Sequence, residues 1–566
     1  MRRPAILMLV LILIGAPNPL WAKEEPGSGR LAILYVNDFH GALEPAARAA
    51  ADGAVGGAAR LVRLAAGIRR ANERAGIATL VVSSGDFLEG PPLSNANKGA
   101  LEARMLNRMG LCAYTLGNHD LDFGPARLAA FMGEIKAPCV TANFAILGKR
   151  AGAPLVVRAG GVLVGIAGLV AARQFSTEKP EVDPAFLQDV RASDETAAAR
   201  AAVADLKRRG AAFVVLLTHL GEKGDRRLAA AVSGIDVICG GHSHTPIRGL
   251  VRAGGAALVQ AGSEGRWLGR LDVVFKKGRP VSIKAGLIPI TAGLPEDPET
   301  ARELAGKKKE LAASLGNEVL AQNRCLLEGD PKALRTRETG SGDLAADAMR
   351  EELHADAAVL NGGAIRAAIA PGPVTRELVR AMLPYTESPT LLLSVTGQDI
   401  ALMLSHSARQ TGGGGFLQVS GLSFVTVPLA GAYSVKVGEE PLDKRRVYTL
   451  AVNSFIATGG DGYTMLRDVP AERRSAHPCA ADLLERFLRT RFGRAGKPLE
   501  YCGPAGRIRE GLPLSGVELL PLRPRAALTP PLSALLDSGP QKAYPLAGFV
   551  ARPFSHSWSA PCSALE

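Results

Sequence analysis

The chain has 566 residues, more than one hydrophobic core normally supports, so two or more domains are expected. With 47% hydrophobic and 21% charged residues, its composition is that of an ordinary globular protein and excludes a disordered or fibrous chain. The net charge of +13 favours anionic ligands, but the basic residues are dispersed and no aromatic residues alternate with them, which argues against nucleic-acid binding.

The first 22 residues have the pattern of an export signal. Arg2 and Arg3 precede an apolar run, and Ala22 is a small residue at which cleavage can occur. The apolar run is too short for a transmembrane helix, which needs about 20 residues. We therefore expect a signal peptide over 1–22 and a soluble periplasmic or secreted protein with no membrane anchor. No obligate protein partner is implied.

Seven cysteines make an odd number, and an oxidising compartment permits disulfides. Cys479 and Cys502 are a plausible pair because they lie near each other in sequence, although spacing alone does not fix the connectivity. Cys112, Cys139 and Cys239 lie in apolar stretches and are expected to be buried thiols. The sequence has no CxxC motif, which argues against a thiolate metal site.

Short apolar runs alternate with helical stretches between residues 30 and 293, which predicts an α/β domain with buried sheets. The expected strands are 31–36, 78–84, 161–170, 211–218, 235–240 and 256–262. A charged stretch, 297–322, predicts an exposed helix within a linker spanning 294–325. Residues 326–510 form a second mixed α/β region, and the Pro-rich tail 511–566 is expected to be poorly ordered.

Polar side chains that can bind a metal ion follow five apolar, strand-like runs of the sequence. A single block such as "GNHDLDFG" (117–124) could be a simple turn, since Gly, Asn and Asp are turn formers. Five such blocks in order are hard to explain as turns, because the carboxyl ends of strands in an α/β sheet meet along one edge. The residues concerned are Asp38, His40, Asp86, Asn118, His119, Asp120, Asp122, His219, His242 and His244.

The chemistry of these side chains favours a pair of divalent cations. Imidazole with carboxylate suits Zn, Mn, Fe or Co rather than Ca, which prefers cages of oxygen ligands. Two cations held about 3.5–4 Å apart by a shared carboxylate can stabilise the attacking and leaving oxygens in a displacement at phosphorus. We therefore expect two divalent metal ions, of Mn, Zn, Co, Mg or Fe, without deciding between them.

The blocks "NDFHG", "GDF", "GNHDLDFG", "THLG" and "GGHSHT" resemble the calcineurin-like metallophosphoesterases, and in particular the periplasmic and cell-surface 5′-nucleotidase family. The resemblance implies a four-layer α/β/β/α sandwich over 30–293. It also implies one metal held by Asp38, His40, Asp86 and His244. The second metal would be held by Asp86, Asn118, His219 and His242, with Asp86 bridging the two.

By the same resemblance, His119 and Asp122 form a catalytic dyad. His119 would stabilise the charge that develops on the phosphoryl group and the leaving oxygen, while Asp122 orients its imidazole. The attacking group would be a metal-bound water or hydroxide. Asp120 is expected to support the structure.

Three blocks of the second region match the substrate-binding domain of the family. "LNGGAIR" places Arg366 for phosphate or carboxylate recognition. "GGGGFLQVSGLSF" contains Phe416 and "NSFIATGGDGYTML" contains Phe455 and Asp461. In the family, two aromatic rings at the positions of Phe416 and Phe455 enclose the base and the Asp contacts the ribose, so residues 326–510 are expected to bind the nucleotide.

Two stretches depart from the family pattern. Asp343 stands where an Asn is usual, and "LPYTESPTL" (383–391) differs from the usual Pro-Phe-x-Asn, which leaves the preferred nucleotide open. We expect an enzyme that converts 5′-nucleoside monophosphates to nucleoside and phosphate, with substrate between the two domains. The alternatives are hydrolysis of 2′,3′-cyclic nucleotides, 3′-nucleotides or nucleotide sugars, a sulfur-ester hydrolase on the same fold, and a binding protein without turnover.

Overall fold

The computed structural model describes residues 27–46, 49–316 and 318–512. The expected signal peptide (1–22) and all but the first two residues of the expected tail (511–566) lie outside these ranges. Across the described ranges, every helix falls short of the length and apolarity that crossing a bilayer demands.

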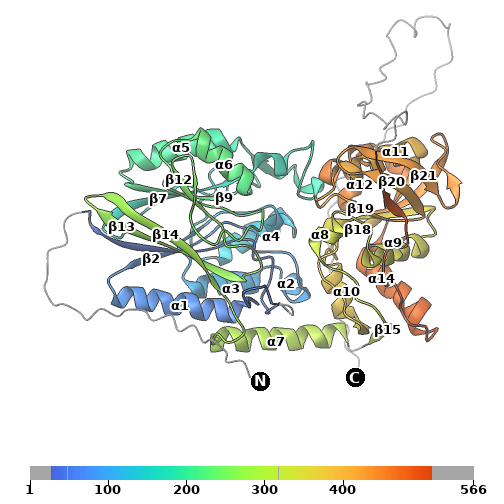
Figure 1. The fold of residues 1–566 in the computed structure, drawn as a ribbon, viewed down its shortest axis with the longest axis horizontal. Helices are drawn as coiled ribbons and strands as arrows, with labels where there is room; N and C mark the ends of the chain where they lie inside the picture. Colours follow the sequence, from blue (N-terminus) through green and yellow to red (C-terminus); the bar gives the residue numbers. More distant parts are fainter. Residues whose placement is uncertain (1–26, 47–48, 317, 513–566) are drawn as a thin grey trace, which may run out of the picture. The chain divides into compact units, whose positions relative to one another are not determined.

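Two β-sheets form the centre of the N-terminal part of the chain (Figure 1). They pack face to face, because Ile33 and Tyr35 of one sheet share a buried cluster with Phe213 and Val215 of the other. The first sheet has the order β14-β13-β1-β2-β3, with β1 (Gly29–Val36), β2 (Ala78–Ser83), β3 (Ala113–Tyr114), β13 (Trp267–Lys276) and β14 (Arg279–Pro289). The second has the order β11-β12-β10-β9-β7-β6, with β6 (Leu155–Ala159), β7 (Val162–Val170), β9 (Phe213–His219), β10 (Val237–Cys239), β11 (Val251–Ala253) and β12 (Ala256–Val259).

Helices cover the outer face of each sheet. Leu34 of β1 packs outwards with Leu61 and Leu106, whereas Leu216 of β9 packs outwards with Leu206. Because both faces of β1 are buried, its sequence is a continuous apolar run without alternation. The predicted α/β/β/α sandwich is therefore confirmed. The covering helices are α1 (Ala58–Arg74), α2 (Pro92–Asn97), α3 (Ala100–Met109) and α4 (Pro125–Glu134) on the first sheet, and α5 (Glu195–Arg208) and α6 (Glu222–Ala231) on the second.

The strands that precede the predicted site run parallel within each sheet. β1, β2 and β3 are parallel neighbours, and so are β7, β9, β10 and β12. Each of the six predicted apolar runs forms one of these strands. The antiparallel pair β13 and β14 extends the first sheet and was not predicted. Gly269 of β13 lies opposite Tyr35 of β1, and the tyrosine ring occupies the space that a side chain at Gly269 would need.

The expected linker contains helix α7 (Pro298–Leu315), which begins after Asp297. The Asp297 carboxylate accepts a hydrogen bond from Thr300 N at 2.9 Å and so caps the helix. Arg108 of α3 pairs with Glu299 and Glu303 of α7 at 2.7 and 2.5 Å. The helix therefore forms as predicted, but it packs against the first domain's helices and is not a free connector.

The C-terminal part contains a five-stranded sheet of order β19-β16-β23-β18-β24 and a four-stranded sheet of order β22-β21-β20-β25. Leu360 of β16 faces a cluster that includes Leu344 and Leu484, and Val359 faces a cluster that includes Ile400 and Phe424. The strands are β16 (Ala357–Asn361), β18 (Pro389–Thr396), β19 (Leu417–Ser420), β20 (Leu422–Val427), β21 (Gly431–Val437), β22 (Glu440–Pro441), β23 (Val447–Asn453), β24 (Arg474–Cys479) and β25 (Ile508–Glu510). The helices are α8 (Pro331–Leu334), α9 (Gly340–Glu352), α10 (Arg376–Met382), α11 (Gly397–Arg409), α12 (Ser454–Ala457), α13 (Thr464–Arg467) and α14 (Ala480–Leu488).

Two small sheets complete the described fold. One consists of β4 (Phe144–Ile146), β5 (Lys149–Arg150) and β8 (Val190–Ala192), and the other of β15 (Val319–Asn323) and β17 (Gly372–Thr375).

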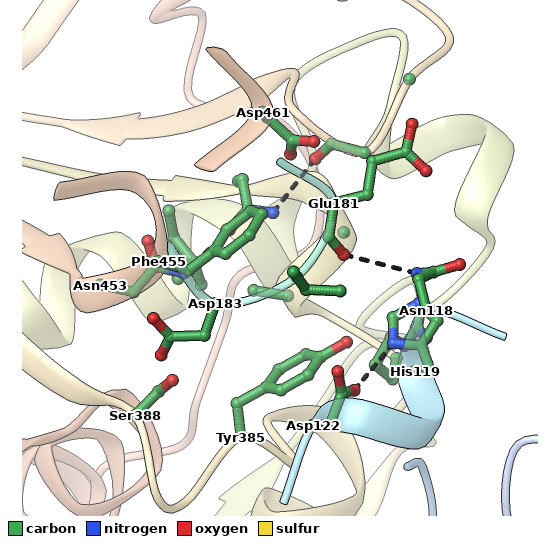
Figure 2. Close-up of a pocket in the computed structure, with 18 of the residues that line it drawn as sticks. Asn118, His119, Asp122, Glu181, Asp183, Tyr385, Ser388, Asn453, Phe455 and Asp461 are labelled. Atoms are coloured by element: carbon green, nitrogen blue, oxygen red, sulfur yellow. Dashed lines mark hydrogen bonds and ion pairs between the residues drawn. The ribbon is translucent and has the colours of Figure 1, made fainter. Parts of the chain in front are cut away.

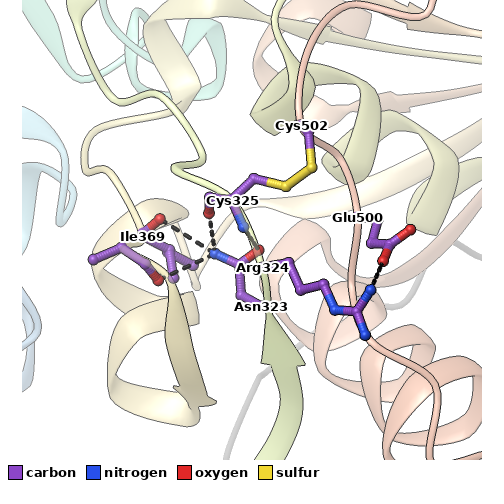
Figure 3. Close-up of a disulfide and its surroundings, with 7 residues drawn as sticks. Asn323, Arg324, Cys325, Ile369, Glu500 and Cys502 are labelled. Atoms are coloured by element: carbon purple, nitrogen blue, oxygen red, sulfur yellow. Dashed lines mark hydrogen bonds and ion pairs between the residues drawn. A yellow bond between two sulfur atoms is a disulfide. The ribbon is translucent and has the colours of Figure 1, made fainter.

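A disulfide joins Cys325 to Cys502, with the two Cα atoms 5.0 Å apart (Figure 3). This corrects the expected pairing of Cys479 with Cys502. Backbone hydrogen bonds between Leu499 and both Gln322 and Arg324 hold the two segments side by side. Cys479 is a buried free thiol at the end of β24. Proximity in sequence therefore did not identify the partner of Cys502. Backbone contacts bring together two cysteines that lie 177 positions apart in the chain.

Replacing Cys325 and Cys502 together by alanine is expected to lower the free energy of unfolding by about 2–5 kcal/mol, because the unfolded chain gains conformational entropy when the disulfide no longer closes a loop. Reductant should lower the melting temperature of the wild type and of Cys479→Ala, but not that of the double variant. A Cys479–Cys502 peptide in a proteolytic digest would contradict the assignment.

Glu102 of α3 is fully buried, and neither of its carboxylate oxygens has a hydrogen-bond partner among the described residues. Burial raises its pKa to about 7, against the opposing effect of Ser94. The folded state therefore binds this proton more tightly than the unfolded chain does, and the resulting stabilisation is lost as pH rises through about 7.

Glu102→Gln is expected to become more stable than the wild type as pH rises from about 5 to 8, by up to about 3 kcal/mol, because an amide has no charge to bury. Urea unfolding at several pH values measures this difference. The exposed Glu439→Gln serves as the control. A constant difference between Glu102→Gln and wild type across this range would refute the prediction.

Candidate active site

Side chains that follow strands of both sheets meet in two groups. The first group is Asp38, His40 and His244, and the second is Asp86, His219 and His242. Within each group, one nitrogen or oxygen atom of every residue lies within 4.8 Å of the others. The sheets are in direct contact here, because His219 Nδ1 donates to the carbonyl oxygen of Ser84 at 2.8 Å.

The turns that carry these residues have a strained backbone. Left-handed φ values are uncommon for residues other than glycine and concentrate at functional sites. Five of the predicted ligands adopt them, namely Asp38 (49°), His40 (46°), Asp86 (54°), His242 (76°) and His244 (55°). The fold therefore holds these side chains on a backbone of higher conformational energy. Such strain indicates that the positions of these side chains serve a function.

In the first group, His40 Nε2 lies 3.0 Å from His244 Nε2, and His244 Nε2 lies 3.5 Å from Asp38 Oδ1. Asp38 is fully buried and accepts hydrogen bonds from the backbone N–H of His242 and from Asn37. Burial, followed by the charge of His40, holds the pKa of His244 well below its usual value. A neutral imidazole of this kind is the form that binds a metal ion.

In the second group, His219 Nε2 lies 3.0 Å from Asp86 Oδ2. Burial lowers the pKa of His219, but Asp86 outweighs this and raises it to about 10. Burial and the charge of His219 lower the pKa of His242 to about 4. Asp86 Oδ2 is also 3.7 Å from His40 Nε2, so this carboxylate lies between the two groups, as a bridging ligand must.

The residues present fit a pair of divalent cations. Two carboxylates, Asp38 and Asp86, are removed from water, and such charges need compensating cations. Each group adds imidazole nitrogens to one of these carboxylates, a donor set that suits Zn, Mn, Fe or Co. Asn118 joins the second group through Gln174, whose Nε2 lies 3.2 Å from Asn118 Oδ1 and 3.1 Å from His242 Nδ1.

The predicted dyad lies beside the metal ligands. His119 Nδ1 is 2.7 Å from Asp122 Oδ2, and the backbone N–H of His119 donates to Asp86 Oδ1 at 2.9 Å. Burial lowers the pKa of His119, but Asp122 outweighs it and raises the pKa to about 9. The imidazole is therefore a cation near neutral pH, with Nδ1 held by Asp122 and Nε2 left for a ligand.

Asp120 has a structural position. Its fully buried carboxylate accepts backbone N–H groups of Asp86, Phe87, Leu88 and Gly117 at 2.7–3.3 Å. It therefore fastens the loop that carries Asp86 to the loop that carries His119.

A cavity of about 370 Å³ opens beside the dyad and is lined by both parts of the chain (Figure 2). Such a volume lies within the usual range for small-molecule sites. Asn118, His119, Asp122 and His242 line one side, and the predicted substrate residues Arg366, Phe455 and Asp461 also line it. Burial raises the pKa of Asp461 to about 6, and its backbone has a φ of 52°.

The structure does not bring Phe416 to this cavity. Its side chain is fully buried and is not among the residues that line the cavity. The backbone of Phe416 instead supports the "LNGG" turn, because its carbonyl oxygen accepts from Gly362 N at 2.7 Å. A ring with no exposed surface cannot stack on a ligand in this conformation, so Phe455 is the only one of the two predicted rings that reaches the cavity.

Several side chains at the site were not predicted from the sequence. Glu89 forms a third group with His119 and Asp122, and its φ of 72° and position before Gly90 follow the pattern of the other site turns. Other unpredicted residues that line the cavity include Lys179, Glu181, Asp183, Arg335, Tyr385 and Asn453. Tyr385 and Asn453 lie in stretches already compared with the family pattern, 383–391 and 453–466, whereas the other four lie in segments without a motif, so the sequence carried no comparable signal for those four.

Both halves of the chain match known families. The family model for calcineurin-like phosphoesterases matches residues 31–246, and that for the 5′-nucleotidase C-terminal domain matches residues 321–468. Enzymes of the first family use two divalent metal ions, in agreement with the two groups of ligands.

Relatives cover most of the chain. The crystal structure of a 5′-nucleotidase precursor from Thermus thermophilus is 30% identical, covers 85% of this chain and 99% of its own, and has a TM-score of 0.75. The 5′-nucleotidase of Bos taurus is 29% identical over 82% of this chain and 88% of its own length. The sulfate thiohydrolase SoxB of T. thermophilus, at 20% identity over 86% of this chain and 97% of its own and a TM-score of 0.67, shares the fold alone. The chain therefore belongs to the 5′-nucleotidase family and is a phosphoester hydrolase.

Proposed function

We propose that this protein is an exported, metal-dependent enzyme that hydrolyses 5′-nucleoside monophosphates to nucleoside and phosphate. The observation that carries the proposal is a single cavity lined by the dyad, by Asn118 and His242 of the proposed metal ligands, and by the predicted substrate residues Arg366, Phe455 and Asp461. The N-terminal pattern over 1–22 and the disulfide support export.

The metal ligands would be Asp38, His40, Asp86 and His244 for one ion and Asp86, Asn118, His219 and His242 for the other. Two bound ions supply positive charge at the phosphoryl oxygens and lower the pKa of a coordinated water. The oxygen of this water would form a new bond to phosphorus as the P–O5′ bond breaks, and the proton that the water gives up would pass to solvent. The imidazolium of His119 stabilises the charge that develops and gives its Nε2 proton to the departing O5′, while Asp122 holds the ring.

Two guanidinium groups suit the phosphate. Arg366 presents its side chain to the cavity, and the Nε of Arg335 is buried without a hydrogen-bond partner among the described residues. An anionic ligand would supply the hydrogen-bond acceptors that a buried, unpartnered guanidinium lacks. Binding of an anion beside it is therefore favourable. At the other side, Phe455 offers a face for the base, worth about 1–3 kcal/mol, and Asp461 offers acceptors for the ribose hydroxyls.

The substrate is tested by phosphate release from 5′-AMP, 3′-AMP, 2′,3′-cyclic AMP and UDP-glucose, each with Mn²⁺ and with chelator. We expect 5′-AMP to react fastest with Mn²⁺ and all activity to disappear with chelator. His119→Ala is expected to lower kcat by about 10²–10⁴, because it removes the proton donor. The exposed His354→Ala serves as the matched control.

Faster hydrolysis of another compound in the panel would keep the mechanism and assign a different substrate. The absence of turnover on all four compounds, with two metal ions bound per chain by elemental analysis, would refute the nucleotidase proposal and favour the binding-protein or sulfur-ester alternatives.

Arg366 is held in place by a buried ion pair with Glu89. Its Nε and Nη2 donate to Glu89 Oε1 and Oε2 at 3.0 and 2.5 Å, and Glu89 is 2% exposed. The pair joins the N-terminal part of the chain to the C-terminal part. A second pair, Lys98 with Glu387 at 2.7 Å, joins the same parts but is exposed.

Glu89→Ala is expected to destabilise the protein by about 3 kcal/mol, because it leaves the charge of Arg366 buried and unpaired. In a double-mutant cycle of urea unfolding, Glu89 and Arg366 should show a coupling energy of about 2 kcal/mol or more. The exposed pair Lys98 and Glu387 should show less than about 1 kcal/mol. Equal coupling in both cycles would contradict the assignment of Glu89 as the partner of Arg366.

A further inference from the structure

Asp183 is a cavity carboxylate without a cationic partner among the described residues. It lies between the 3₁₀ turn Ala172–Phe175 and the turn Pro184–Phe186, and its Oδ1 accepts from Ala185 N at 2.9 Å. The other cavity carboxylates differ in this respect, since Glu181 pairs with Arg173 and Asp461 lies near Lys179 and Arg335. Within the described part of the chain, the Oδ2 of Asp183 is therefore a hydrogen-bond acceptor that no donor uses.

Asn453 supplies a second unused acceptor. The Nδ2 of Asn361 donates to the carbonyl oxygen of Gly414 at 3.3 Å, which leaves Asn361 Oδ1 to accept from Asn453 Nδ2 at 2.9 Å. This chain of hydrogen bonds fixes the orientation of both amides. The Oδ1 of Asn453 is then left buried without a hydrogen-bond partner in residues 27–46, 49–316 and 318–512, and Asn453 lines the cavity.

These two acceptors lie on the side of the cavity where the base is expected. Figure 2 shows Asp183, Asn453 and Phe455 together, away from His119 and Asp122. This side therefore offers one aromatic face and two oxygen acceptors to whatever part of the ligand is remote from the phosphate.

We propose that Asp183 is a specificity-determining residue that selects nucleobases with an exocyclic amino group over the corresponding oxo bases. The inference rests on the proposed function, because it requires the base to stack on Phe455. An amino group has two N–H donors, one for Asp183 and one for Asn453. An oxo base places oxygen lone pairs against the carboxylate and leaves both acceptors without a donor. A site whose buried polar groups lose their partners discriminates strongly against such a substrate.

The experiment compares kcat/KM for two pairs of substrates that differ in this group, AMP with IMP and CMP with UMP. The wild type is expected to prefer AMP and CMP by about 10-fold or more. Asp183→Asn keeps an oxygen for Ala185 N but presents an amide N–H to the cavity, so the preference should fall to about unity or reverse. Asp189→Asn, a neighbouring carboxylate outside the cavity lining, should leave both ratios unchanged.

Calorimetric binding of adenosine and inosine to the metal-loaded protein separates this inference from the proposed function. Tighter binding of adenosine that Asp183→Asn abolishes would support the inference even if no nucleotide is hydrolysed. Equal kcat/KM for amino and oxo substrates in the wild type, or a preference that survives Asp183→Asn, would overturn it.

Discussion

The arrangement of the N-terminal half depends on two buried carboxylates, Asp38 and Asp86. Both are almost fully removed from water. An ionised carboxylate is costly to bury unless cations and hydrogen bonds surround it. The fold meets this demand by ending parallel strands of both sheets at one place, so that His219 and His242 reach Asp86 while His40 and His244 reach Asp38. The turns that do so hold non-glycine residues at positive φ, and the buried strands on which they end keep this strain in place.

The loops around the carboxylates are positioned by groups that take no part in the chemistry. Asp120 accepts four backbone N–H groups and joins the loop of Asp86 to the loop of His119. Gln174 connects Asn118 to His242. Because each of these groups is buried, its hydrogen bonds are not exchanged for water, and the site residues keep their relative positions.

The cavity depends on both halves of the chain. The N-terminal part contributes the dyad, Asn118 and His242 of the proposed metal ligands, and the segment around Asp183, and the C-terminal part contributes Arg366 and Phe455. Contacts such as the hydrogen bond from Asp461 N to the carbonyl oxygen of Pro180 connect these loops directly. The charges are also divided, since Arg366 is compensated by Glu89 whereas Asp183 has no cationic partner among the described residues. The proposed recognition of phosphate and of base therefore falls to different parts of one cavity.

The sequence by itself determined an α/β domain, the ends of its strands and the side chains that follow them, because an apolar run followed by Gly, Asp or His is a local signal. The four-layer arrangement and the assignment of ligands to each metal were predicted from the resemblance to a known family. Tertiary structure alone decided the partner of Cys502, the burial of Phe416 and the presence of Glu89 and Asp183 at the site. The pair β13 and β14 also escaped prediction. The disulfide, the burial of Phe416 and the placement of Asp183 arise from contacts between segments far apart in the chain, and such contacts leave no periodicity or motif in a single sequence. The hairpin of β13 and β14 is local, with Lys276 paired to Arg279, and it was simply not recognised.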